Sequence, residues 1–398
     1  MTISTEDGIV AAVAEAVQSR EPILVQGNGT KSGMMRPVQA ARTISTAALS
    51  GITLYAPKEL ILSARAGTPL PEIEAALAEA GQYMIAEPPD LSALLGSTGK
   101  PQTLGGIIAT NLSGPRRVAW GAMRDHVLGI RAVTGRAEVI RSGGRVLKNV
   151  TGLDLCKLLT GSHGTLGIIT EITLKVLPAP EATGTLVLPG LDAVAAVAAL
   201  SNALGSPYSV SGAAWLPAEA VATIPALAEL RQSAALIRIE EFAPSVAYRI
   251  ARLRDQFAVA GALTLDTETS RTVWRDVRDA QPLAARPEDA VWRVSVRPSA
   301  GPSVLAALRP HGVGGFLDWG GGLVWLAGPA DTATHLAVEA AAQAVKGTWT
   351  LLRAPDALRG AVRVIPDEPA ALARISRQVK AALDPANILN PGRLYAGA

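Results

Sequence analysis

The sequence predicts an α+β protein built from two domains. Its 398 residues exceed what one ordinary hydrophobic core organises, and 48% hydrophobic against 18% charged residues is typical of a well-buried globular chain. Short buried strands alternate with amphipathic helices from the N-terminus onward, which is the ordering of a mixed fold. Pro178, Pro180 and Gly184 interrupt this alternation, so we place the domain boundary there.

The first half begins with a helix and continues as short strands and helices. Apolar residues recur at helical spacing over 7–19, with Glu6 and Asp7 near the start, where the helix dipole favours negative charge. A buried strand at 23–25 runs into a glycine-rich turn. The other expected elements are strands at 51–56, 60–66, 127–134, 137–141 and 168–176 and helices at 71–80 and 153–160. Glycine and small polar residues predict a loop at 100–118.

The second half alternates alanine-rich helices with strands and contains no repeat of fixed period. The expected elements are helices at 193–204, 244–259 and 331–345 and strands at 234–239, 290–296 and 322–326. We therefore expect one domain at 1–180, a second at 185–382, and a turn-rich tail at 383–398.

Composition excludes several classes of protein. The balance of 37 Lys+Arg against 34 Asp+Glu includes no concentrated basic stripe, so we expect no nucleic-acid partner. A single cysteine, Cys156, excludes an internal disulfide and a zinc or iron–sulfur site held by cysteines of this chain alone. The polar start at 1–7 has no signal-peptide pattern, and the apolar stretch 191–200 is too short for a membrane span. A cytoplasmic protein is expected, with membrane contact only through partners.

Three glycine-rich loops lie in the predicted first domain. The first follows the strand at 23–25 and reads QGNGTKSG, whose small residues let main-chain N–H groups approach a phosphate. A Walker A loop would need glycine in place of Thr30, and the G-x-G-x-x-G fingerprint would need glycine in place of Ser32. Taken alone, this loop fits an anion site and a structural turn equally well.

Two further loops favour a ligand. Residues 99–111 combine a glycine pair with threonine and asparagine, and residues 161–170 run from a glycine-rich turn into a strand. Three such loops in one domain indicate a long ligand that main-chain groups contact along its length. FAD, with a pyrophosphate between two flat ring systems, is a ligand of this kind.

The order of these loops resembles the FAD-binding fold shared by vanillyl-alcohol oxidase and p-cresol methylhydroxylase. Residues 143–155 resemble the glycolate oxidase subunits more narrowly, and the segments 170–176 and 390–393 add to this likeness. The resemblance covers 22–178 and 383–394 and is strongest to the FAD-binding companion subunits of bacterial glycolate oxidase. Those subunits work beside a larger flavin-containing catalytic subunit and an iron–sulfur subunit.

The resemblance implies a PCMH/VAO-type FAD-binding domain at 1–180, an α+β cap domain at 185–382 and a tail at 383–398 that returns to the first domain. It assigns the pyrophosphate to Gly27, Asn28, Gly29 and Thr30, and the path from there to the flavin to Thr103, Gly105, Gly106, Thr110 and Asn111. It assigns the adenosine half to Gly164, Gly167, Ile168 and Ile169. The tail contacts would come from Asn390 and Arg393. Relatives that attach flavin covalently use a histidine in the first loop. This chain has none there, so FAD should bind non-covalently. His163 and Leu153 stand where the family usually has Glu and an aromatic residue.

Catalytic residues are not evident. Oxidation of a 2-hydroxy acid needs a base for the hydroxyl proton and a cation for the carboxylate, and catalytic relatives supply a His and acidic cluster, often with a metal. The four histidines, His126, His163, His311 and His335, have no such spacing, so we assign no catalytic residue and expect no metal. We interpret His163 as a hydrogen-bonding support near the nucleotide. Arg293, Arg297 and Arg309 are interpreted as surface or salt-bridge residues, and Trp292, Trp319 and Trp325 as core or subunit-interface residues.

We therefore expect a FAD-binding subunit of a glycolate (2-hydroxy-acid) oxidase complex, which supports assembly or passes electrons to its partners. One alternative is a self-sufficient FAD-dependent oxidase of a small hydroxy acid or alcohol. A second alternative is a structural subunit whose FAD site has decayed. The failed fingerprint disfavours a nicotinamide-dependent dehydrogenase.

Overall fold

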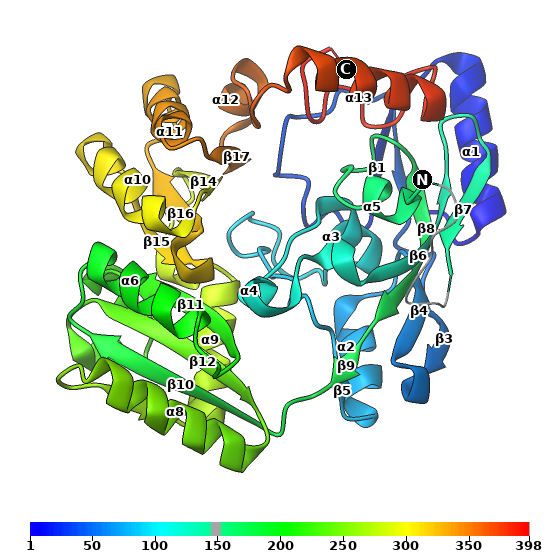
Figure 1. Cartoon of the computed structure of the whole chain (residues 1–398). Coiled ribbons are helices and arrows are strands. Elements are labelled where there is room, and N and C mark those ends of the chain that lie inside the picture. Colours follow the sequence, from blue (N-terminus) through cyan, green and yellow to red (C-terminus); the bar gives the residue numbers. More distant parts are fainter. Residues whose placement is uncertain (145–152, 398) are drawn as a thin grey trace. The chain divides into compact units, whose positions relative to one another are not determined.

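The computed structural model describes residues 1–144 and 153–397, which form two compact units (Figure 1). Unit 1 comprises residues 1–112, 122–179 and 367–398, and unit 2 comprises residues 113–121 and 180–366. Most of the stretch 143–155, which carried the narrower resemblance, lies outside the described residues.

Unit 1 is organised around an antiparallel sheet of five strands in the order β3-β4-β8-β6-β7. The strands are β3 (Ile52–Ala56), β4 (Ile61–Arg65), β6 (Val127–Val133), β7 (Val139–Gly143) and β8 (Ile168–Lys175). Helices α2 (Leu70–Glu79), α3 (Leu104–Thr110) and α5 (Leu155–Leu159) share one hydrophobic core with it, to which Ile73, Ile107 and Ile172 contribute fully buried side chains. Two short strands, β5 (Gln82–Tyr83) and β9 (Leu177–Pro178), also pair here. The short helix α4 (Arg117–Trp120) belongs to unit 2.

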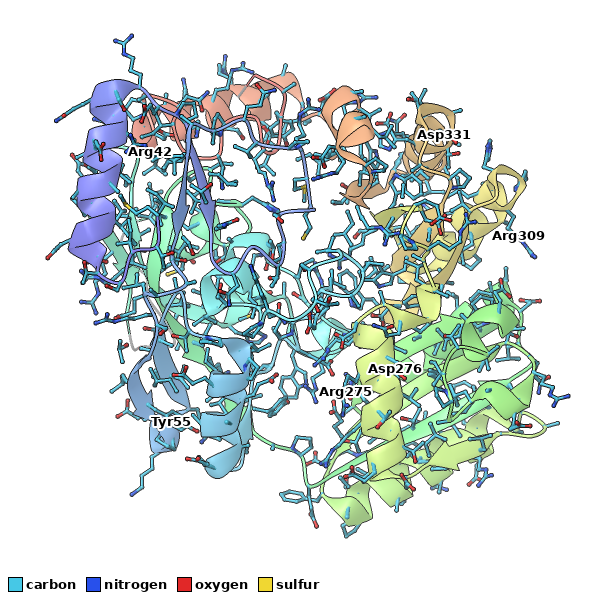
Figure 2. The ribbon with its side chains drawn as sticks, turned by 180° about the vertical axis from the view of Figure 1, so that it is seen from behind. Arg42, Tyr55, Arg275, Asp276, Arg309 and Asp331 are labelled. Atoms are coloured by element: carbon cyan, nitrogen blue, oxygen red, sulfur yellow. The ribbon has the colours of Figure 1, made fainter. Side chains whose placement is uncertain are left out.

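A second core in unit 1 joins the two ends of the chain. Helix α1 (Glu6–Ser19) packs its buried Ile9 and Val13 against the parallel strands β1 (Ile23–Gln26) and β2 (Arg42–Ser45). Leu389, near the C-terminus, is buried in the same cluster. Arg42, labelled in Figure 2, pairs with Glu15 of α1 at 3.1 Å and also with Glu21. The tail that follows helix α13 (Ala370–Leu383) is therefore part of this core.

Unit 2 holds an eight-stranded sheet in the order β13-β10-β12-β11-β15-β16-β14-β17, antiparallel at each pairing. The strands are β10 (Ala182–Pro189), β11 (Val210–Leu216), β12 (Ala234–Glu241), β13 (Leu263–Leu265), β14 (Ala290–Ser295), β15 (Gly314–Asp318), β16 (Leu323–Gly328) and β17 (Thr348–Arg353). The helices are α6 (Ala193–Leu204), α7 (Ala218–Val221), α8 (Ala243–Phe257), α9 (Thr267–Arg278), α10 (Gly301–Leu308), α11 (Thr332–Ala344) and α12 (Asp356–Ala361).

Helices cover both faces of this sheet. A Cβ at Gly184 would lie 2.3 Å from Ile250 Cδ1 of α8, whereas the next residue, Thr185, accepts a hydrogen bond from Trp274 Nε1 of α9 at 2.9 Å. Adjacent residues of a strand point to opposite faces, so α8 and α9 pack on opposite sides of β10. Among the described helices of the chain, none is long and apolar enough to cross a bilayer.

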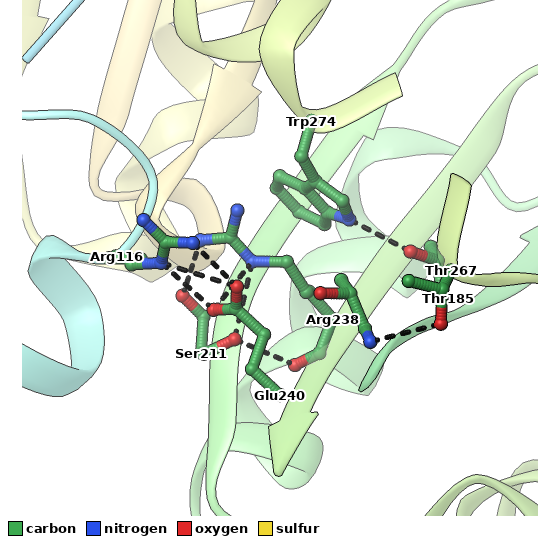
Figure 3. A network of polar contacts seen from close by, with 8 residues as sticks. Arg116, Thr185, Ser211, Arg238, Glu240, Thr267 and Trp274 are labelled. Atoms are coloured by element: carbon green, nitrogen blue, oxygen red, sulfur yellow. Dashed lines mark hydrogen bonds and ion pairs between the residues drawn. The ribbon is translucent and has the colours of Figure 1, made fainter. Parts of the chain in front are cut away.

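The bounds of the compact units differ from the predicted domains in two places. Residues 113–121 belong to unit 2 although the surrounding sequence belongs to unit 1, and α13 belongs to unit 1 although we expected the second domain to extend to residue 382. The first difference has a local cause in Arg116, which lies next to α4 and bonds to Glu240 of β12 (Figure 3).

Glu240 is the centre of a buried ionic network in unit 2. Arg116 donates to its carboxylate with Nη2 at 2.7 Å and Nε at 3.0 Å, and Arg238 Nε lies 3.3 Å from the same carboxylate. Arg238 also donates to Ser211 and stacks over the ring of Trp274 at 4.6 Å. Burial raises the pKa of Glu240, but the charges of Arg238 and Arg116 outweigh burial and hold that pKa at about 2.

Replacing Glu240 by alanine should destabilise the protein by about 3–5 kcal/mol, because it leaves a buried arginine without its counter-charge. The neighbouring substitution Glu241→Ala is the control, since the Glu241 side chain is 39% exposed, and it should cost about 0–1 kcal/mol. Urea denaturation measures both.

The stabilisation from Glu240 should be complete above pH 4.5 and should weaken as the pH falls toward 2, because its folded pKa lies below its ordinary value. Equal costs for the two substitutions would contradict the assignment.

Candidate FAD-binding site

The three glycine-rich loops and the C-terminal tail line one cleft in unit 1, with about 760 Å³ of empty space that is partly open to solvent. Its lining includes all but one of the residues predicted to bind FAD: Gly27, Asn28, Gly29, Thr30, Thr103, Gly105, Gly106, Thr110, Gly164, Gly167, Ile168, Ile169, Asn390 and Arg393. His163, interpreted from the sequence as a support near the nucleotide, also lines the cleft, and the further lining residues are Leu24, Val25, Gln26, Lys31, Ser32, Thr46 and Ala109.

The first loop leaves β1 and presents main-chain donors. Within the described part of the chain, the N–H groups of the four residues 28–31 make no hydrogen bond. Gly29 has a φ of 75°, which favours glycine, and the hydroxyl of Ser45 donates to the carbonyl of Gly27 at 2.9 Å. A Cβ at Gly27 would lie 2.2 Å from Thr103 Oγ1. Glycine is therefore required where the first loop approaches the second.

The second loop is shorter than predicted, because helix α3 begins at Leu104 inside the stretch expected to be a loop. Thr103 caps this helix by accepting from Gly106 N at 3.4 Å, and Thr110 Oγ1 donates to the carbonyl of Gly106 at 2.9 Å. The buried side chains of Ile107 and Ile108 supply the packing that favours the helix despite its glycine pair. The Asn28 amide donates to Pro101 O at 2.8 Å and joins this loop to the first.

Asn111 is the one predicted residue that does not line the cleft. It ends α3 in a left-handed conformation with a φ of 51°, and its side-chain oxygen accepts from Arg124 N at 3.0 Å. Asparagine is one of the few residues that adopt this conformation readily, which explains why it stands at the end of α3.

The third loop is hydrogen-bonded to the C-terminal end of α3. Gly161 N donates to Ile108 O at 3.0 Å, and His163 N donates to Ala109 O at 2.8 Å. His163 has a φ of 52°, and a Cβ at Gly164 would lie 2.8 Å from Asn390 Nδ2. The glycine therefore permits the close approach of the C-terminal tail.

The tail connects the first and third loops. Asn390 Oδ1 accepts from Val25 N and Asn390 Nδ2 donates to His163 O, each at 2.8 Å. Arg393 donates to the carbonyls of Lys31 at 3.0 Å and Arg36 at 3.3 Å. These contacts show how two residues more than 350 positions from the first loop hold its conformation.

Three residues with ionisable side chains line the cleft, namely Lys31, His163 and Arg393. Burial, and then the charge of Arg393, lowers the pKa of His163 to about 3, so its imidazole is neutral at physiological pH. Burial lowers the pKa of Lys31 to about 8, against the charge of Asp90, which raises it. The sequence pattern assigned no role to Lys31. Its place directly after the four small residues of the first loop was the available signal.

These features fit FAD. Unpartnered N–H groups at 28–31 suit the acceptor oxygens of a pyrophosphate, and the approach of the glycines leaves main chain rather than side chains at the cleft wall. Leu24, Val25, Ile168 and Ile169 supply apolar surface for the flat rings. No Asp or Glu lines the cleft among the described residues, so nothing there repels a diphosphate.

The other candidate residues lie elsewhere. His335 is fully buried in unit 2, where it accepts from Trp292 Nε1 at 3.1 Å and contacts Glu339 at 3.2 Å, so it is a packing residue. His126 is buried in unit 1. His311, Arg297 and Arg309 are exposed, and Figure 2 shows Arg309 on the surface. Trp292 and Trp325 are core residues, whereas Trp319 is half-buried.

Over the described ranges, no group of three or more His, Cys, Asp or Glu residues could hold a metal ion.

Residues 1–143 match the family described as FAD binding domain, and FAD is therefore the cofactor of this chain. The chain is 34% identical to glycolate oxidase subunit GlcE of Escherichia coli (strain K12) over 389 residues, which is 98% of this chain and 97% of that protein. It belongs to this family of glycolate oxidase subunits.

Other similarities agree with this assignment. The chain is 27% identical to glycolate oxidase subunit GlcD of Bacillus subtilis (strain 168), over 74% of this chain and 58% of that protein. It is 33% identical to a D-lactate dehydrogenase of Anaerostipes hadrus, over 47% of this chain and 37% of that protein. A solved structure of alkyldihydroxyacetonephosphate synthase superposes with a TM-score of 0.71, covering 98% of this chain and 76% of that chain at 18% identity, which shows a shared fold.

The substitution Gly27→Ala should weaken FAD binding at least about tenfold, because its Cβ would overlap the Thr103 hydroxyl and push the first two loops apart. Quenching of FAD fluorescence during titration of the apoprotein measures the dissociation constant. Gly360→Ala is the control, since a Cβ there meets nothing within 4 Å. Unchanged affinity in Gly27→Ala would show that the approach of these loops does not matter for binding.

Proposed function

We propose that this chain is a FAD-binding subunit of a glycolate oxidase that holds FAD non-covalently beside a larger flavin-containing catalytic subunit and an iron–sulfur subunit. The observation that carries the proposal is a single cleft lined by three loops and the tail, with cofactor-binding groups but without an acid–base set. Family membership supports the glycolate oxidase assignment.

Within the cleft, each set of residues has a separate task. The main-chain donors of 28–31 bind the pyrophosphate, and the α3 segment that begins at Thr103 orients the flavin half. The third loop at 164–169 contacts the adenosine half, while Asn390 and Arg393 hold the loops in place. Bound FAD supplies a two-electron acceptor that can pass electrons onward.

Substrate oxidation is assigned to the partner subunit. Removing the hydroxyl proton of a 2-hydroxy acid requires a base with a pKa near the working pH. The His163 imidazole, with a pKa of about 3, is too weak a base, and no carboxylate lines the cleft in the described part of the chain. The chain therefore supports assembly of the complex or relays electrons through its flavin.

Arg293 favours a second candidate function, a self-sufficient oxidase of a small hydroxy acid. Its guanidinium lies over the rings of Trp325 at 5.0 Å and Trp319 at 5.4 Å, and its buried Nε has no hydrogen-bond partner among the described residues. Burial, and then the charge of Arg117, lowers its pKa to about 10. A cation with a spare donor suits a substrate carboxylate, but the missing base disfavours this alternative.

We infer a cytoplasmic location, with membrane contact through the partner subunits. The absence of a long apolar helix among the described residues supports this location.

The purified chain should be yellow, and acid precipitation should release all its FAD into the supernatant, because no covalent bond is formed. Absorption spectra of the protein before precipitation and of both fractions afterwards measure this. Flavin that stays in the pellet would contradict non-covalent binding. A colourless chain that cannot be reconstituted with FAD would instead support a decayed site.

The chain with FAD bound should oxidise glycolate far more slowly than the complete complex, for which a rate of about 10 per second would be ordinary. Stopped-flow bleaching of the flavin under anaerobic conditions measures reduction by glycolate directly. Reduction of the isolated chain at the rate of the complex would contradict the division of labour and favour the self-sufficient oxidase. In that case Arg293→Met should abolish the bleaching, whereas the exposed Arg309→Met should not.

A further inference from the structure

Lys31 is the one primary ammonium group in the cleft lining. The other cations there are the guanidinium of Arg393 and, when protonated, the imidazole of His163. Arg393 donates hydrogen bonds to the carbonyls of Lys31, Ser32 and Arg36 and so holds the loop. Lys31 contacts the second loop, where its Nζ donates to Gln102 Oε1 at 2.7 Å. An ammonium group has three donors, so this bond leaves capacity for a ligand.

The position of Lys31 points to an anion. It directly follows the loop whose N–H groups at 28–31 make no hydrogen bond among the described residues. Its ammonium donates to the neutral amide of Gln102, and the exposed carboxylate of Asp90 acts on it through its charge. A partly buried cation beside a row of free main-chain donors is the arrangement that binds phosphate groups.

We propose that the Lys31 ammonium pairs with the diphosphate of FAD and makes cofactor affinity depend on pH. This inference rests on the proposed function, because it concerns the same cleft. It adds a charged contact beside the main-chain donors of residues 28–31. It also predicts that FAD is released more readily as the pH becomes alkaline.

The direction of the pH effect follows from the charge state of Lys31. Without ligand its pKa is about 8, and a bound diphosphate raises that pKa by stabilising the ammonium. FAD should therefore bind with constant affinity below about pH 8 and more weakly as the pH rises above it. Of the groups that face Lys31, Asp90 favours the ammonium, Gln102 is neutral, and the guanidinium of Arg393 stays charged. His163 is already neutral at pH 7, with its pKa near 3.

The test is the dissociation constant of FAD from pH 7 to 9.5 in the full chain and three variants. Wild-type affinity should fall about tenfold or more across this range. Lys31→Met should bind FAD about 10–100-fold more weakly at pH 7, with a flat pH profile, because a charge-assisted contact is lost. Lys31→Arg should keep the pH 7 affinity within about threefold and should also show a flat profile, since arginine stays protonated. Lys100→Met, an exposed lysine of the second loop, is the control and should behave as wild type.

Competition by ADP separates a diphosphate contact from a contact to the flavin. ADP should displace FAD from the wild type, and Lys31→Met should weaken ADP as much as it weakens FAD. Undiminished ADP affinity in Lys31→Met, or a wild-type affinity that is constant or rises with pH, would overturn the proposal. If the wild type bound no FAD at all, the proposed function itself would fail. If Lys31→Met failed to fold, the profiles of the wild type and Lys31→Arg would still decide the matter.

Discussion

The side-chain amide of Asn390 is the contact on which the cofactor cleft depends. Main-chain donors bind a long ligand only when the loops that carry them are held at fixed separations. Contacts from outside the loops must fix those separations. The Asn390 side chain accepts a hydrogen bond from Val25 N and donates one to His163 O. One side chain therefore fixes the spacing of the first and third loops. The burial of Leu389 in the core of α1, β1 and β2 places that side chain. A C-terminal tail that crosses back to the start of the chain is thus part of the site.

The polar character of the cleft follows from the same design. Because the loops contribute main-chain groups, the cleft can carry little side-chain chemistry, and burial shifts the pKa values of Lys31 and His163 away from their ordinary range. Such a site binds and orients a cofactor but offers few groups for proton transfer. This agrees with a subunit that holds FAD within a larger oxidase.

The sequence was sufficient to group the three glycine-rich loops, which line one cleft, because glycine and small polar residues mark positions where main chain can approach a ligand. Periodicity located α1, β4 and β8 within a residue or two. It missed α3, since Gly105 and Gly106 lower helix propensity and the compensating cap and packing at 103–108 are tertiary features. The transfer of 113–121 to unit 2 depends on the pairing of Arg116 with Glu240, 124 positions apart, which no local pattern reveals. The sequence also could not predict the environment of Lys31, because its burial and its contact with Gln102 arise only in the folded chain.

Hydrogen exchange of the main-chain amides, measured by mass spectrometry with and without FAD, tests the shared cleft most directly. Peptides that cover 27–31, 104–110 and 163–169 should all gain protection when FAD binds, with no matching change in the eight-stranded sheet of unit 2. Protection confined to one of the three loops, or spread evenly over the chain, would contradict the account.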